Sequence, residues 1–313
     1  MGVKLMKEYK YIFGPIPSRR MGLSLGVSPI PKKTCNYSCI YCQLGRTDKM
    51  TNERREYFPL EGIVEEFKEY IKNNDNFDVV TVVGEGEPTL YSRLGELIDK
   101  LKALTEKPVA VIANGGLFDL EEVRLDLMKA DIVLPTFDAC DEEEFIKVNR
   151  PIKKINFKDI YEGLCKFCRE YKGQLWVEVM LVKGFNDSEE SLKKLRELLK
   201  GLRYDRLYIN TPVRPPAEGY AGQVSKDTMI KASEILEGIA IDTLTEGSFY
   251  SEEKDNYKAI LDIIKRHPMN QHEIISFLTD RNAENIDDIV KGLEEDSKVE
   301  VVNYKGYKTF RLI

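Results

Sequence analysis

The sequence predicts an α/β fold, a partial barrel or open sheet of parallel strands, followed by a small α+β module. Short β-branched runs alternate with helical apolar patterns along most of the 313 residues. This alternation is typical of parallel strands joined by helical crossovers. After about residue 247 the pattern changes to closely spaced helices and a hairpin. We therefore expect one domain of residues 1–246 and a second of residues 247–313.

The first domain is expected to contain six strands separated by five helices. Each predicted helix has apolar residues three and four positions apart, which buries one of its faces. In such folds ligands bind at the carboxyl ends of the strands, so functional side chains are expected just after them. The predicted strands are 24–30, 78–83, 109–113, 132–137, 175–182 and 206–211, and the predicted helices are 62–73, 91–104, 120–129, 157–171 and 189–201.

The C-terminal residues have the element order of a winged-helix module, joined by a polar linker at 247–256. Such modules commonly place their third helix in the major groove of DNA. Here residues 282–297 hold six acidic residues and a single basic one, Lys291, which would repel phosphates. We expect the module to dock a protein or cover a site rather than bind DNA. The predicted helices are 257–266, 270–278 and 282–295, and the predicted hairpin strands are 299–302 and 308–312.

Charge is distributed unevenly along the chain. The formal net charge is −6, yet residues 1–60 hold 11 Lys and Arg against 4 Asp and Glu, a net charge of +7, and the remainder carries −13. No apolar run is long enough to cross a membrane, and the N-terminus lacks the apolar stretch of a signal peptide. We therefore expect a cytoplasmic protein with a basic front segment.

Three cysteines, Cys35, Cys39 and Cys42, follow the first predicted strand with the spacing C-x3-C-x2-C. A zinc site needs four ligands, and the two histidines, His267 and His272, lie far along the chain. Three thiolates on a [4Fe-4S] cluster leave one iron open to a cofactor or substrate. The alternative is three structural cysteines, which the tight spacing on a polar loop disfavours.

This motif resembles that of the radical S-adenosylmethionine (SAM) superfamily, whose pattern is C-x3-C-x-aromatic-C with Tyr41 as the aromatic residue. The resemblance covers roughly residues 10–220 and implies a partial (β/α)6 barrel. It further implies a [4Fe-4S] cluster on the three cysteines, SAM bound to the open iron, and Tyr41 near the adenine. SAM cleavage to a 5′-deoxyadenosyl radical then requires an electron donor of the flavodoxin or ferredoxin type.

A glycine-rich loop follows the second predicted strand, where the superfamily places its motif for the methionine amino group. Matching that motif assigns Gly86 and Glu87 to this role, with Gly84 before them. Glycines permit close backbone approach, and a carboxylate complements an ammonium. Without the cysteine motif, the loop would be interpreted as an ordinary turn.

Polar residues at four further strand ends are candidates for cofactor binding. Asn114 resembles the residue that family members place near the methionine moiety, and Asp138 resembles an acceptor for the ribose hydroxyls. Both are also common turn caps. Glu178 is a charged residue within an apolar strand, which needs a partner if buried, either the cofactor or a salt bridge. Asn210 closes the sixth strand.

The segments 14–22 and 210–216 resemble a branch of iron-sulfur oxidoreductases grouped with wybutosine-type tRNA-modifying enzymes. This resemblance and the basic front segment favour a tRNA base as the substrate, with a peptide or protein as the second candidate. A different class of function is a redox-sensing regulator that holds the cluster without turnover. The glycine loop and the acidic third helix argue against it.

Arginines near the predicted cluster suggest a clamp for an anionic substrate. The candidates are Arg19, Arg20 and Arg214, for which surface salt bridges are the alternative. Cys165 and Cys168 form a C-x2-C pair that invites an auxiliary cluster, but they lie in a helical apolar pattern that favours burial. Cys140 follows a strand end and is either a hydrogen-atom donor to a product radical or an inert buried thiol.

Overall fold

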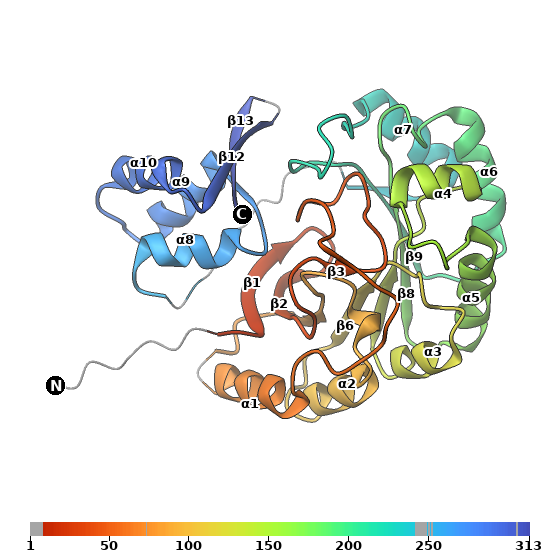
Figure 1. Ribbon diagram of the computed structural model, residues 1–313, viewed down its shortest axis with the longest axis horizontal. Helices are drawn as coiled ribbons and strands as arrows, with labels where there is room; N and C mark the ends of the chain where they lie inside the picture. The colour runs from red at the N-terminus through yellow and green to blue at the C-terminus, as the bar shows by residue number, and fades with distance from the viewer. Residues whose placement is uncertain (1–8, 73, 242–248, 250, 252, 305) are drawn as a thin grey trace.

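The computed structural model describes residues 9–72, 74–241, 249, 251, 253–304 and 306–313. An eight-stranded sheet is wrapped on its outside by helices, and the C-terminal elements pack beside β1 (Figure 1). No helix among these residues is long and apolar enough to cross a membrane.

The sheet is an open, partial barrel with the strand order β1-β2-β5-β6-β7-β8-β9-β10. β1 is antiparallel to β2, and every other neighbouring pair is parallel. The six predicted strands are confirmed, whereas β1 and β10, which end the strand order, were not predicted. The strands are β1 (Ile12–Ser18), β2 (Gly22–Val27), β5 (Val79–Val82), β6 (Val109–Ala113), β7 (Ile132–Pro135), β8 (Gln174–Met180), β9 (Arg206–Asn210) and β10 (Ile239–Ala240).

Helices connect the parallel strands and bury their apolar faces against the sheet. The five predicted helices are present, and two more, α4 and α7, were not predicted. α4 was missed because its eight residues begin with three glutamates, and Phe145 and Val148 are its only buried apolar residues. The helices are α1 (Leu60–Ile71), the short 3-10 helix η1 (Pro88–Leu90), α2 (Leu94–Lys102), α3 (Glu121–Leu127), α4 (Glu142–Asn149), α5 (Phe157–Glu170), α6 (Glu189–Lys200) and α7 (Lys226–Leu236).

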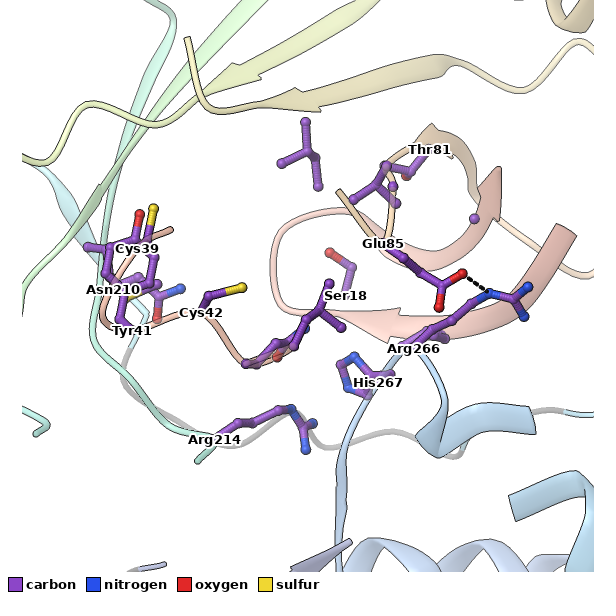
Figure 2. A pocket seen from close by; sticks show the side chains of 18 of the residues that line it. Ser18, Cys39, Tyr41, Cys42, Thr81, Glu85, Asn210, Arg214, Arg266 and His267 are labelled. Atoms are coloured by element: carbon purple, nitrogen blue, oxygen red, sulfur yellow. Dashed lines mark hydrogen bonds and ion pairs between the residues drawn. The ribbon is translucent and has the colours of Figure 1, made fainter. Parts of the chain in front are cut away.

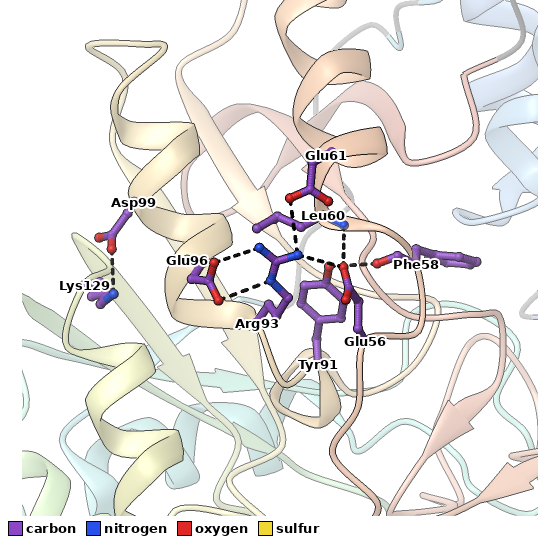
Figure 3. Close-up of polar contacts among 9 residues, drawn as sticks. All are labelled: Glu56, Phe58, Leu60, Glu61, Tyr91, Arg93, Glu96, Asp99 and Lys129. Carbon is purple, nitrogen blue, oxygen red and sulfur yellow. Dashed lines mark hydrogen bonds and ion pairs between the residues drawn. The ribbon is translucent and has the colours of Figure 1, made fainter.

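The cysteine loop leaves β2 and contains its own two-stranded parallel pair, β3 (Thr34–Cys35) and β4 (Lys49–Met50). A polar cluster fixes the segment that follows it. Arg93 binds Glu56 of this segment at 3.0 Å and Glu96 of α2 at 2.8 Å, and the Glu56 carboxylate also accepts the N–H of Leu60 (Figure 3). The returning chain is therefore held against the start of both α1 and α2.

The C-terminal module, residues 253–313, has a core of its own, built around Ile260, Phe277, Leu293 and Phe310. The three predicted helices and the predicted hairpin are present, with one additional short strand. The predicted boundary near residue 247 and part of the predicted linker lie outside the described residues. The elements are α8 (Asn256–Ile264), β11 (Met269–Asn270), α9 (Gln271–Asp280), α10 (Ile286–Glu295), β12 (Val299–Tyr304) and β13 (Tyr307–Leu312), with the sheet order β11-β13-β12.

A Gly163→Ala substitution should destabilise the barrel domain. A Cβ at this position in α5 would overlap the backbone at Phe118 and Asp119, which cannot move aside as a flexible side chain would. We expect the free energy of unfolding to fall by about 1–3 kcal/mol, the usual cost of overpacking. Denaturant unfolding followed by circular dichroism measures the change.

Gly219→Ala is the matched control, since a Cβ there would meet no atom within 4 Å. Its free energy of unfolding should stay within about 0.5 kcal/mol of that of the unmodified protein. Equal stability of the two variants would show that α5 does not pack as closely as described.

Candidate active site

A cavity of about 430 Å³ opens at the carboxyl ends of the strands. The cysteine loop lines one side of it, the glycine loop after β5 and the ends of β8 and β9 line others, and the C-terminal module contributes Arg266 and His267 (Figure 2). The cavity therefore lies at the carboxyl ends of the strands, where ligands bind in folds of this kind.

All three motif cysteines line this cavity and are unpaired thiols. Sulfur atoms of two of them accept weak hydrogen bonds. The Tyr37 N–H lies 3.4 Å from the Cys35 sulfur, the Asn114 amide lies 3.6 Å from the same atom, and the Asn149 amide lies 3.6 Å from the Cys39 sulfur. Such donors orient the thiols and favour the thiolate form.

Burial of the three thiols fits a positively charged iron group beside them. Burial raises the pKa of Cys39 to about 12 and also raises the pKa values of Cys35 and Cys42. Such buried thiols ionise only beside a strong positive charge, which iron supplies. Three thiolates on a [4Fe-4S] cluster leave one of its irons open to a further ligand.

The glycine loop lies directly against the cysteine loop. A Cβ on Gly86 would overlap the carbonyl oxygen of Thr34, and the Glu87 N–H donates to that oxygen at 3.0 Å. Gly84 and Gly86 both line the cavity. Only glycine at position 86 allows this approach, so the sequence there sets the distance between the two loops.

The two glutamates of this loop point in different directions. The carboxylate of Glu87 accepts the N–H groups of Thr89 and Asn114 at 3.0 and 2.8 Å, so it fixes the loop, and Glu87 is absent from the cavity lining. The contact of Glu87 with the methionine end of SAM stays a prediction. Glu85 lines the cavity and was not singled out from the sequence, although the alternation Gly-Glu-Gly-Glu carried that signal.

Asn114 and Asp138 support the cysteine loop from behind the cavity lining. The Asn114 amide donates to Asn36 at 2.6 Å. Asp138 accepts from Tyr41 at 2.5 Å and from Asn149 at 2.7 Å, and burial raises its pKa to about 6. Their cofactor contacts stay predictions, and the structure gives both residues a positioning role.

Tyr41, Glu178 and Asn210 line the cavity, as the sequence analysis expected of cofactor-binding residues. Glu178 forms an ion pair with Arg20, and the Asn210 amide lies 3.5 Å from the same carboxylate. The alternative of a salt bridge for Glu178 is therefore present in the structure. These three side chains remain the candidates that can reach a ligand directly.

The arginines of the predicted clamp line the cavity, but two of them are paired inside the protein. Arg20 binds Glu178. Arg214 binds the Glu273 carboxylate of the C-terminal module through its two terminal nitrogens, at 2.9 and 3.0 Å. Arg19 donates to the carbonyl of Ile241 at 2.8 Å. The salt-bridge alternative thus accounts for Arg20 and Arg214, and their anion binding stays a prediction.

The remaining cysteines lie away from the cavity lining. Cys168 is buried in the core beneath α5, where its pKa is raised to about 12 by burial, and Cys165 packs against the same core. Cys140 is also buried, and its pKa is likewise raised to about 12. Their packing in or against the core agrees with the buried role that the sequence favours for all three over an auxiliary cluster or a hydrogen-atom donor.

The C-terminal module is tied to the rim of the cavity by several polar contacts. Arg266 binds Glu85 at 3.3 Å and the carbonyl of Lys10 at 2.8 Å, and the Tyr304 hydroxyl donates to Pro212 at 2.7 Å. Arg266 and His267 were not predicted as site residues, because nothing in their neighbourhood along the chain indicates a site.

Residues 30–199 match the family model of the radical SAM superfamily. With the cysteine motif, the strand-end cavity and this match, the chain belongs to the radical SAM superfamily. It is accordingly an enzyme of that superfamily, whose cofactors are a [4Fe-4S] cluster and SAM.

Similar proteins come from several organisms. The chain is 37% identical over 303 residues to a UPF0026 protein of Methanocaldococcus jannaschii, covering 94% of this chain and 93% of that one. It is 36% identical over 278 residues to a UPF0026 protein of Helicobacter pylori, covering 87% and 89%. A Brachyspira hyodysenteriae protein named GTPase Obg is 36% identical over 302 residues, and the chain spans 44% of its length.

Solved structures share the fold. A radical SAM methyltransferase from Sphaerobacter thermophilus aligns with a TM-score of 0.51 at 15% identity, over 72% of this chain and 67% of that one. Streptococcus suis SuiB aligns with a TM-score of 0.51 at 16% identity, over 76% and 54%. At these identities the likeness concerns the fold alone.

A Gly86→Ala substitution should impair cofactor binding. The added Cβ forces the glycine loop away from Thr34 and hence from Cys35. We expect SAM affinity to fall by about tenfold or more, since displacing a binding group by an ångström has effects of this order. Equilibrium binding to the anaerobically reconstituted protein measures it.

Gly222→Ala serves as the control, because its Cβ would lie 4.0 Å from the nearest side chain and outside the cavity lining. It should bind SAM as the unmodified protein does. Unchanged affinity in the Gly86→Ala variant would contradict the importance of the contact between the two loops.

Proposed function

We propose that the chain cleaves SAM reductively and uses the resulting 5′-deoxyadenosyl radical to abstract hydrogen from a substrate bound in the same cavity. The observation that carries this proposal is the convergence of the cysteine loop and the glycine loop on one cavity at the strand ends. A [4Fe-4S] cluster held by the cysteines would supply the electron, received from a reduced donor, that splits a carbon–sulfur bond of SAM into methionine and the 5′-deoxyadenosyl radical.

The chain's own residues provide binding and orientation. Cys35, Cys39 and Cys42 would hold three irons of the cluster, which would leave the fourth for the methionine end of SAM. Tyr41 is fixed by its hydrogen bond to Asp138, so its ring is held at the cavity wall where the adenine is expected. The backbone of Gly84 and Gly86 offers polar groups to the methionine amino group.

A tRNA base is the proposed substrate, supported by one comparison. A probable dual-specificity RNA methyltransferase RlmN of Malacoplasma penetrans is 27% identical over 224 residues, covering 66% of this chain and 63% of that protein. The basic front segment remains the second support for this choice, although three of its eleven basic residues, Arg20, Arg46 and Arg54, bind carboxylates of the later segment. A peptide substrate and a cytoplasmic location stay predictions.

The electron donor is proposed to be of the flavodoxin or ferredoxin type, as expected for radical SAM chemistry. The C-terminal module is proposed to be a second domain that covers the site rather than a DNA-binding domain. Its contacts with the cavity rim through Arg214 and Arg266 support this role, since both bind across to the other part of the chain.

Anaerobic reconstitution tests the proposal directly. The protein should take up about four irons per chain and release 5′-deoxyadenosine from SAM when reduced with dithionite. Cys42→Ser should lower this activity at least about 100-fold, a larger effect than losing a group that only orients a ligand. Iron content and product chromatography measure both quantities.

Cys165→Ser is the matched control, because this thiol packs on α5 outside the cavity lining. Its iron content and activity should equal those of the unmodified protein, which also tests the auxiliary-cluster prediction. A stable cluster that never cleaves SAM under reducing conditions would instead favour the redox-sensing regulator.

A further inference from the structure

His267 is one feature of the cavity that the proposed function leaves unexplained. It comes from the C-terminal module, directly after Arg266 in the turn that follows α8, and it lines the same cavity as the cluster cysteines (Figure 2). Its ring nitrogen Nε2 is buried and has no hydrogen-bond partner among the described residues. A buried polar atom without a partner is costly, which implies that a ligand satisfies it.

The position of His267 is fixed rather than accidental. Its neighbours on both sides bind across to the barrel domain, since Arg266 binds Glu85 and the Pro268 carbonyl accepts from Arg214. The ring also packs against Phe249, with the two centroids 5.4 Å apart. Contacts before and after the residue thus hold the imidazole at the cavity wall.

The charges around the ring indicate what it binds. The imidazole is neutral because burial and the nearby Arg214 and Arg19 keep the pKa of His267 well below its usual value. A neutral imidazole carries one N–H donor, and in electropositive surroundings the favoured partner is a negatively charged oxygen. The carboxylates of Glu178, Glu273 and Glu85 pair with Arg20, Arg214 and Arg266, and no described residue hydrogen-bonds to His267 Nε2, although Glu85 Oε1 is likewise buried without a partner among the described residues.

We propose that His267 is a substrate-binding residue and that its Nε2 N–H donates to an oxyanion of the substrate, a carboxylate or a phosphate. This inference rests on the proposed function, since it assumes that a substrate enters the cavity beside SAM. If His267 binds the substrate, the C-terminal module forms part of the substrate site. The substrate then carries an anionic group on the side that faces this module.

Two simple anions test the proposal without knowledge of the substrate. Inorganic phosphate and acetate are titrated by calorimetry into the reconstituted protein saturated with SAM. At least one anion should bind, and the tighter of the two identifies the oxyanion. His267→Leu removes the donor at similar volume and should weaken that binding about tenfold or more, the usual effect of losing a charge-assisted hydrogen bond.

Two further variants make the result specific. His267→Gln keeps an N–H donor and should recover most of the affinity, which loss of folding in the leucine variant would not allow. His272→Ala removes the other histidine of the chain, which is exposed on α9 outside the cavity lining, and should bind the anion as the unmodified protein does.

Three outcomes would overturn the proposal. Neither anion binds, the leucine variant binds as tightly as the unmodified protein, or the anion competes with SAM and so belongs to the cofactor site. SAM cleavage measured on the same preparation reports on the proposed function separately, so its failure and the failure of this inference are distinguishable.

Discussion

The close approach of Gly86 to the Thr34 carbonyl is the constraint on which the site depends. It joins the loop after β5 to the strand β3 that carries Cys35, two segments about fifty residues apart in the chain. Glu87 strengthens the contact by donating its N–H to Thr34 and accepting the N–H of Asn114. The cysteine loop is therefore positioned by backbone contacts within the chain itself, which is the support that such sites require.

A second layer of amide and carboxylate side chains holds the same loop from the opposite side. Asp138 and Asn149 bind each other, and they contact Tyr41 and the Cys39 sulfur. All of these groups come from strand ends or from α4, so the rigid sheet determines where the loop lies. Polar residues at strand ends therefore lie close to the cysteine loop, and Asn114 and Asp138 lie behind the cavity lining rather than in it.

The sequence predicted the central strands, the helices between them and the three cysteines, because each depends on a local pattern. It could not predict β1 or β10, whose short or irregular segments form strands only by pairing with β2 and β9. Nor could it identify Glu85, Arg266 and His267, because their roles depend on contacts between residues about 180 positions apart. Local patterns determine elements, whereas tertiary contacts determine which side chains face the cavity.

The charged residues show the same contrast between local sequence patterns and tertiary contacts. The basic front segment and the acidic remainder look like separate surfaces in the sequence, yet in the structure some of their charges pair across the fold. Arg46 binds Glu218 at 2.8 Å, and Arg54 binds Asp126 at 2.5 Å. The net charge of a segment therefore overstates the charge that these arginines offer to a substrate. One group that carries information about the ligand is the neutral imidazole of His267, whose buried Nε2 has no partner among the described residues, as is also true of Arg20 Nε and the Tyr37 hydroxyl in the same cavity lining.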